Sequence, residues 1–304
     1  MLRNANPVPV SPDFGPDVEG SRRLSTNVIL ISKDSVLFYA NEYSLLQYSS
    51  NSFNGLLPLS SQDKDKRIIY LRDLHSTELD VLLQSIYGVT PQSPTNGNDI
   101  AKLHLLSRGI GWLSVFGIPP KSVVLSSTYI FTRILSFAPV HPLETYAIAG
   151  QYDLYDLAVA VSSHTLPVEL SNVDERLAAC MGARYLLRLF HLHLNRKATL
   201  SSLLSKELEY HDETENCRFT NQNKAKNRWK TAMASLMWNA SLDMSTCLIR
   251  ESVLSHTSDT ICDECIKARD ARLKIILTEW SISAARYCVI TLRFFYLLHP
   301  FRGQ

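Results

Sequence analysis

The sequence has 304 residues, of which 45% are hydrophobic and 20% are charged, and its formal net charge is +2. This length favours two domains or one domain with a large extension, and the apolar fraction is sufficient for a sizeable core. A net charge this small excludes the strongly basic class of nucleic-acid-binding proteins, so we expect no nucleic-acid partner.

The first 24 residues predict a disordered arm. They contain Pro7, Pro9, Pro12 and Pro16 and lack the apolar core of a signal peptide. Without an export signal, we expect the six cysteines to be reduced thiols in the cytoplasm or nucleus.

Residues 27–88 predict a compact unit that combines strands and helices. Apolar runs at 27–32, 36–40 and 68–71 are typical of short strands, with two small helices between the second and third, around Leu45-Leu46 and Phe53–Leu57. The unit closes with an amphipathic helix whose apolar side chains recur at helical spacing. The residues of this face are Leu79, Leu82, Leu83, Ile86 and Tyr87. The residues expected to lie largely off it are Glu78, Asp80, Gln84 and Ser85.

This order of elements resembles the BTB/POZ domain, through Val36–Tyr39, Ser50–Phe53 and Leu71 with its following helix. The resemblance implies a protein-interaction module without chemistry of its own. Asn27 stands where the family usually has Asp, and Asn41 where it usually has His. In the family these two positions often form a contact at the dimer surface, so the amides argue against the usual dimer mode.

The rest of the chain is similar to the helical extension of BTB-containing proteins from basidiomycete fungi. The most specific stretch is His141–His164, and the resemblance covers roughly residues 25–288. It implies an α+β protein, in which a small three-stranded sheet with helices is followed by an irregular all-α bundle. The expected divisions are a disordered arm (1–24), a BTB/POZ-like domain (25–120), a helical extension (121–290) and an apolar tail (291–304).

Helical spacing and proline positions predict the helices of this extension. They are expected at 101–116, from Thr128 to near Phe137, from Pro142, and at 182–204, 223–239, 248–254 and from Cys262 onward. We expect the three tryptophans Trp229, Trp238 and Trp280 to fill the core. The apolar stretch Tyr287–Phe301 is interrupted by Arg293 and is too short to cross a bilayer, so we expect a last core helix or a tail that packs on a partner.

The sharpest candidate for chemistry is Cys262-Asp-Glu-Cys265, because two thiolates three residues apart can hold one side of a tetrahedral zinc. Two further ligands are needed, and Cys217 and His211 of the polar loop 207–223 could supply them. A redox pair is a second alternative. Nothing in the loop sequence holds it beside the pair, so we expect Cys262 and Cys265 to bind no metal.

The remaining candidates are weaker, and we predict no catalytic, cofactor-binding or metal-binding residue. His191 and His193 point to different sides of a helix, with one expected to be buried and the other solvated. Gly109-Ile-Gly111 lacks the third glycine of a dinucleotide motif. Asp153 and Asp156 are expected on the wet face of a helix.

The sequence therefore favours a non-catalytic protein that binds itself or another protein through the BTB-like domain. The resemblance leaves the partner open, from a homodimer to a ubiquitin-ligase adaptor or a transcriptional regulator. The alternative is a metal-supported regulatory protein with a small zinc site around Cys262 and Cys265. We do not expect an enzyme.

Overall fold

The protein is described by a computed structural model, in which side chains are described as far as residue 283. The described ranges are 8–16, 26–58, 67–91, 98–209 and 211–298. The chain divides into two compact units. The first comprises Met1–Val161 and Ala179–Gly182, and the second comprises Ser162–Ala178 and Ala183–Gln304. The segment 121–161, which the sequence assigned to the helical extension, thus belongs to the first unit.

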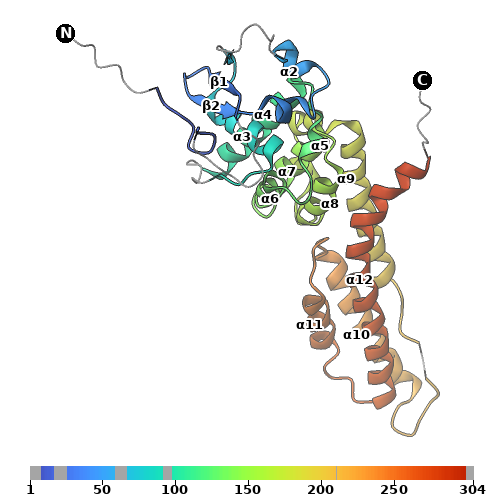
Figure 1. The fold of residues 1–304 in the computed structure, drawn as a ribbon. Helices are drawn as coiled ribbons and strands as arrows, with labels where there is room; N and C mark the ends of the chain where they lie inside the picture. The colour runs from blue at the N-terminus through green and yellow to red at the C-terminus, as the bar shows by residue number, and fades with distance from the viewer. Residues whose placement is uncertain (1–7, 17–25, 59–66, 92–97, 210, 299–304) are drawn as a thin grey trace. The chain divides into compact units, whose positions relative to one another are not determined.

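The first unit has an α+β architecture, as the sequence predicted (Figure 1). Each of the three strands begins within one residue of its predicted position. The elements are β1 (Val28–Ser32), β2 (Leu37–Ala40), α1 (Glu42–Leu46), α2 (Ser52–Gly55), β3 (Ile68–Leu71), α3 (Ser76–Tyr87), α4 (Asp99–Val115), α5 (Pro120–Val123), α6 (Tyr129–Leu135), α7 (Pro142–Gln151) and α8 (Tyr155–Ser162).

The sheet has the order β2-β1-β3, with β1 antiparallel to β2 and parallel to β3. Alternate side chains of a strand point to opposite faces, so each strand contributes to an inner and an outer face. The inner face is buried. Its members are Val28, Leu30, Phe38, Ala40, Ile69 and Leu71.

The predicted apolar face of α3 is confirmed, because Leu79, Leu82 and Leu83 are fully buried and Ile86 is nearly so. The helix is buried on more sides than its sequence indicates, since Gln84 and Ser85 are also buried. Gln84 contacts the arm, since its amide donates to Asp13, and α4 packs against α3 at Gly109. A Cβ atom there would lie 2.5 Å from the side chain of Val81, so only glycine allows this approach.

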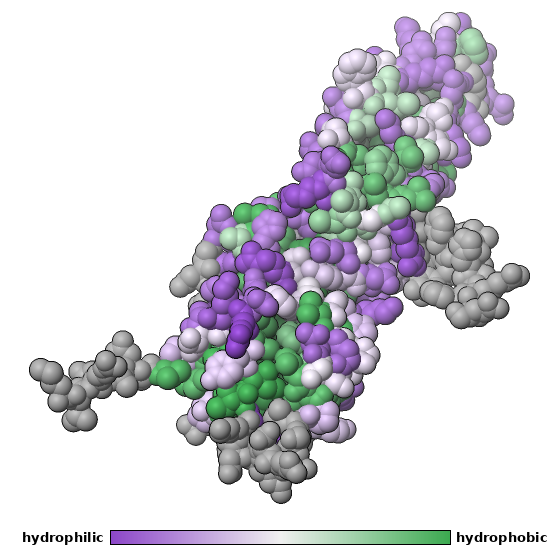
Figure 2. Space-filling model, turned by 90° about the horizontal axis from the view of Figure 1, so that it is seen from above, coloured by the Kyte–Doolittle hydropathy of each residue, from purple (hydrophilic) through white to green (hydrophobic). Residues whose placement is uncertain are grey.

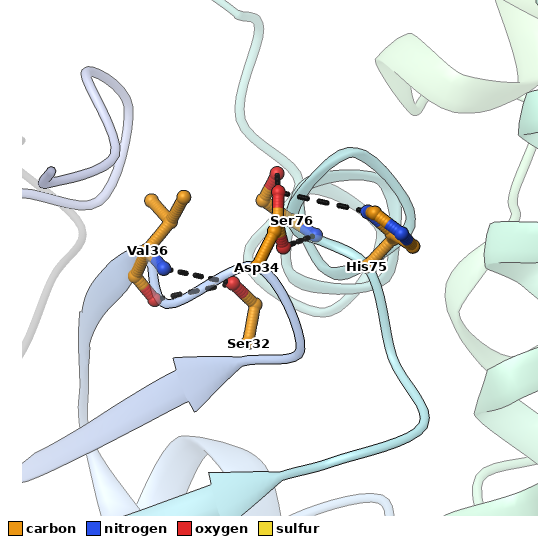
Figure 3. Close-up of polar contacts among 5 residues, drawn as sticks. All are labelled: Ser32, Asp34, Val36, His75 and Ser76. Carbon is orange, nitrogen blue, oxygen red and sulfur yellow. Dashed lines mark hydrogen bonds and ion pairs between the residues drawn. The ribbon is translucent and has the colours of Figure 1, made fainter.

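The turn between β1 and β2 is tied to the start of α3 (Figure 3). Asp34 accepts hydrogen bonds from the backbone N–H of Ser76 at 2.8 Å and from its hydroxyl at 2.6 Å. Burial raises the pKa of Asp34, but these hydrogen bonds outweigh it and lower the pKa to about 2. The carboxylate therefore holds the sheet to the helix as an anion at the positive end of the helix dipole.

The second small helix differs from the prediction at Phe53–Leu57. In α2 the residues Ser52, Phe53 and Asn54 all have positive φ, so this element is a left-handed turn rather than a regular helix. The turn drives Phe53 into the core, where its ring stacks on that of Phe116 at 4.2 Å between centroids. Tertiary packing has overridden the local preference here.

The predicted disordered arm is wrong for residues 8–16, which lie along β2. The backbone N–H of Ser11 donates to Leu37, Leu37 donates to Pro9, and Tyr39 donates to Phe14. Phe14 is fully buried. The remainder of the arm, 1–7 and 17–24, lies outside the described residues.

The second unit is helical and contains α9 (Glu175–Leu204) apart from Ala179–Gly182, together with α10 (Phe219–Trp238), α11 (Thr246–His256) and α12 (Asp263–Leu298). α9 is interrupted at Gly182, whose φ of 69° is not helical. One apolar core joins these four helices around Trp229 and Trp280. Trp238 was wrongly predicted to join this core, because 90% of its surface is exposed.

The apolar C-terminal stretch continues α12 as far as Leu298. The side chains after residue 283 and the whole of 299–304 lie outside the described residues, so the expected packing of this tail is not observed. Within the part of the chain that the structure describes, every helix is too short or too polar to cross a membrane.

Candidate functional site

The outer face of the sheet is apolar although no described helix buries it. The register places its side chains in two rows across the strands, because residues directly opposite one another point to the same side. One row is Tyr39–Ile29–Ile68, and the other is Leu37–Ile31–Tyr70.

Exposure increases along both rows towards β3. The side chains on β1 and β2 are half-buried, whereas Ile68 is 43% and Tyr70 64% exposed. Figure 2 shows hydrophobic side chains gathered on the first unit, in the lower half of the view. Lys33, Arg72 and Asp73 are exposed at the ends of these strands. An apolar centre with a charged rim is the usual composition of a protein–protein interface.

The two edges of the sheet differ. The β2 edge is covered by the arm 8–16 through the hydrogen bonds described above. Among the described residues, β3 forms strand pairs with β1 alone, so its other edge is unpaired. An unpaired edge next to exposed apolar side chains can accept another chain by strand addition or by face-to-face packing.

The side chains of Asn27 and Asn41 are both used within the chain. Asn27 accepts the backbone N–H of Glu42 at 2.8 Å, and Asn41 accepts that of Ser44 at 3.1 Å. Both therefore satisfy N–H groups at the start of α1, which otherwise lack partners in a helix. This structural role accounts for the amides without a contact between subunits.

The arm is joined to α3 through two aspartates, the buried Asp13 of the arm and the part-buried Asp80 of the helix. The hydroxyl of Ser11 donates to Asp80 at 3.1 Å, and the amide of Gln84 donates to Asp13 at 3.4 Å. Burial raises the pKa of Asp80 to about 7, and the negative charges of Asp13 and Asp34 add to this effect. Attachment of the arm therefore favours the neutral form of Asp80.

The structure brings together four predicted candidates in the second unit, His211, Cys217, Cys262 and Cys265. Their ligand atoms all lie within 4.8 Å of one another. The Nε2 atom of His211 is 3.4 Å from the sulfur of Cys262 and 3.3 Å from that of Cys265. The sulfurs of Cys217 and Cys265 are 3.8 Å apart.

Backbone hydrogen bonds hold the loop that carries His211 and Cys217. Thr214 and Cys217 exchange two hydrogen bonds of 3.1 Å, which form a tight turn. The Gln222 amide donates to the carbonyl of His211 at 3.0 Å, and Glu213 accepts the N–H of Phe219 at 2.6 Å. The first turns of α10 therefore fix the loop, contrary to the expectation that nothing holds it in place.

The three thiols of this cluster have different acidities. Hydrogen bonding from the backbone N–H of Cys265 lowers the pKa of Cys262 to about 7, as expected for a residue at the N-terminal end of a helix. Burial raises the pKa of Cys265 to about 12 and also raises that of Cys217. The hydrogen bond of the His211 ring with the carbonyl of Asp212 raises the pKa of His211.

Of the other candidates, the two histidines lie as the sequence indicated, whereas Asp153 is not helical as expected but lies in the turn between α7 and α8, with a φ of 52°. His193 is buried and His191 is exposed, on different sides of α9. Asp153 and Asp156 are exposed. Gly109 serves the contact between α3 and α4, which explains a glycine that resembled part of a nucleotide-binding loop.

Comparisons with known proteins give no match, whether with family models, with curated proteins or with solved structures. The functional conclusions therefore depend on the residues and the geometry of this chain.

Proposed function

We propose that this protein is a non-catalytic interaction protein, which binds a second copy of itself or another protein through the outer face of the β2-β1-β3 sheet. The observation that carries the proposal is the pair of apolar rows that ends in exposed Ile68 and Tyr70. The BTB-like order of elements in the first unit supports the same class of function.

Apolar side chains that face water on a sheet are unfavourable, and a partner that covers them removes this free-energy cost. Burying apolar surface contributes roughly 25 cal/mol per Å², and large aromatic side chains such as Tyr70 are enriched among the residues that dominate interface energies. Along β1, apolar residues occupy both faces, a pattern typical of strands that are covered on both sides. The covering layer on the outer side is the proposed partner.

The amide caps of α1 favour this face over a contact centred on Asn27 and Asn41. Both side-chain oxygens already accept backbone hydrogen bonds inside the chain. A contact that took these oxygens would compete with the backbone hydrogen bonds, and loss of the Asn41 N-cap typically costs about 1 kcal/mol.

The test uses a double variant, Ile68→Ser with Tyr70→Ser, in the full chain. Its matched control is Leu125→Ser with Val140→Ser, a second exposed pair in the same unit, where the side chains are 49% and 66% exposed. Sedimentation velocity over a range of concentrations measures self-association, and affinity capture compared across the three proteins measures binding to others. Circular dichroism establishes that each variant is folded.

We expect wild type and control to associate, with themselves or with one captured protein, and the face variant to lose that association. The proposal is overturned if wild type is a monomer at all concentrations and the face variant captures the same proteins as wild type. It is also overturned if the face variant and the wild type associate equally.

A further inference from the structure

We propose that His211, Cys217, Cys262 and Cys265 form a structural zinc site in the second unit. This inference is independent of the sheet face, since all four residues and the elements that hold them belong to the second unit. The ligand set, three sulfurs and one imidazole, is one of the standard sets of closed structural zinc sites.

The distances match the edges of a coordination tetrahedron. With Zn–S bonds of about 2.3 Å and Zn–N bonds of about 2.0–2.1 Å, two sulfurs lie about 3.8 Å apart, and a sulfur and a nitrogen about 3.5 Å apart. The observed separations are 3.8 Å between Cys217 and Cys265, and 3.4 and 3.3 Å from His211 to Cys262 and Cys265. All the separations in the cluster are within 4.8 Å, so none exceeds such an edge by more than about 1.3 Å.

The histidine presents the correct nitrogen. Its Nδ1 lies 2.6 Å from the carbonyl oxygen of Asp212, which can only accept a hydrogen bond. Nδ1 must therefore carry the proton, and the neutral ring keeps its lone pair on Nε2, the atom that faces the sulfurs. Metal-bound histidines characteristically donate their other nitrogen to a backbone carbonyl in this way.

The positions of the four ligands suit a permanent site. Cys262 immediately precedes α12, where its carbonyl accepts the N–H of Ile266, and Cys265 lies in the first turn of this helix. Cys217 is fully buried in the turn before α10. A metal here would join this turn to the start of α12, although Cys217 and Cys265 are 48 positions apart in the sequence.

Two other roles for the cluster fit less well. A disulfide requires sulfurs about 2.05 Å apart, and all the cysteines that the structure describes are free. A catalytic Cys–His pair requires one thiolate facing a substrate, whereas here a single nitrogen lies at similar distances from two sulfurs with a third beside them.

The first experiment measures metal in the full-length protein, purified with a non-thiol reductant and dialysed against zinc-free buffer. We expect one zinc per chain by elemental analysis, released when an organomercurial reacts with the thiols. Replacement by Co²⁺ should give the intense visible absorption of a tetrahedral thiolate site. Folded, reduced protein without bound zinc and without a tetrahedral Co²⁺ spectrum would overturn the proposal.

Matched variants separate a metal site from packing. His211→Ala should lose the zinc, and His256→Ala should keep it, since His256 is an exposed histidine that also contacts a backbone carbonyl through Nδ1. Cys265→Ser should lose the zinc as well, and Cys247→Ser, at an exposed cysteine, should keep it. If Cys265→Ser does not fold, His211→Cys is the alternative test of the site. This variant should still bind zinc, because a fourth thiolate replaces the imidazole. Equal metal content in all variants would overturn the assignment.

Discussion

The buried carboxyl of Asp80 predicts a specific dependence of stability on pH. Its folded-state pKa is about 7, compared with 3.8 for a free aspartate. The unfolded chain therefore loses this proton first as the pH rises, and between pH 4 and 7 the folded state holds more protons. The contribution of Asp80 to the free energy of unfolding must therefore fall across this window and stay low above it. Only well below the free value of 3.8 is the carboxyl neutral in both states, where it contributes no penalty.

The magnitude follows from the difference of about three pKa units. At about 1.4 kcal/mol per unit, the ionisation of Asp80 costs up to about 4 kcal/mol of stability at pH 8. Asp80→Asn keeps the shape of the side chain and an oxygen that can accept the hydrogen bond of Ser11, but cannot ionise. We expect the variant to be more stable than wild type by about 1–4 kcal/mol at pH 8 and by less than about 1 kcal/mol at pH 4.

Urea unfolding of the full chain at pH 4, 6 and 8, followed by circular dichroism, measures this difference. Asp156→Asn, at an exposed aspartate of the same unit, is the control and should follow wild type at each pH. The reasoning is refuted if Asp80→Asn is less stable than wild type at pH 8, or if its advantage does not change with pH.

Three further substitutions test the packing of the first unit by denaturant unfolding. Leu82→Ala should cost about 2–5 kcal/mol because Leu82 is fully buried, whereas Leu125→Ala, half exposed, should cost far less; equal losses would contradict the core assignment. Asn41→Ala should cost about 1 kcal/mol through loss of the α1 cap, and an unchanged stability would show that the cap is dispensable. Gly109→Ala should cost about 1–3 kcal/mol, since the added Cβ meets Val81 at 2.5 Å; a neutral change would mean that the helices separate freely.

Hydrophobic spacing predicted most of the secondary structure, because period and breaker residues are local signals. The strands, the apolar stripe of α3 and the helix starts at Thr128 and Pro142 needed only neighbouring residues. The left-handed turn at Phe53 was beyond this method, since the packing of its ring on Phe116 decides the backbone there. The packing of the arm was also missed, because it depends on contacts with β2 and α3, remote in the chain.

The sequence of β1 contained a signal that could have predicted the apolar outer face of the sheet. Apolar residues without alternation, as in Val28–Ile31, predict a strand covered on both faces, and one face here has no cover among the described residues. Spacing also argued against Trp238 as a core residue. At about 100° per residue, its position is about 180° around the helix from Trp229.

The four residues of the proposed zinc site could be identified from the sequence, but their approach to one another could not be predicted. The pair of cysteines at the start of α12 was visible, and so were His211 and Cys217 in the polar loop. Their approach depends on the Thr214–Cys217 turn and on hydrogen bonds from the first turns of α10, which no spacing rule describes. Loop ligands far apart in sequence are therefore the part of a site that sequence alone predicts least well.

The most direct measurement of the metal centre is X-ray absorption at the zinc edge of the full-length, reduced protein. The account predicts a first shell of three sulfurs at about 2.3 Å and one nitrogen at about 2.0–2.1 Å, reduced to two sulfurs in any zinc retained by Cys217→Ser. A shell of oxygen and nitrogen alone, or the absence of a zinc edge in folded protein, would contradict it.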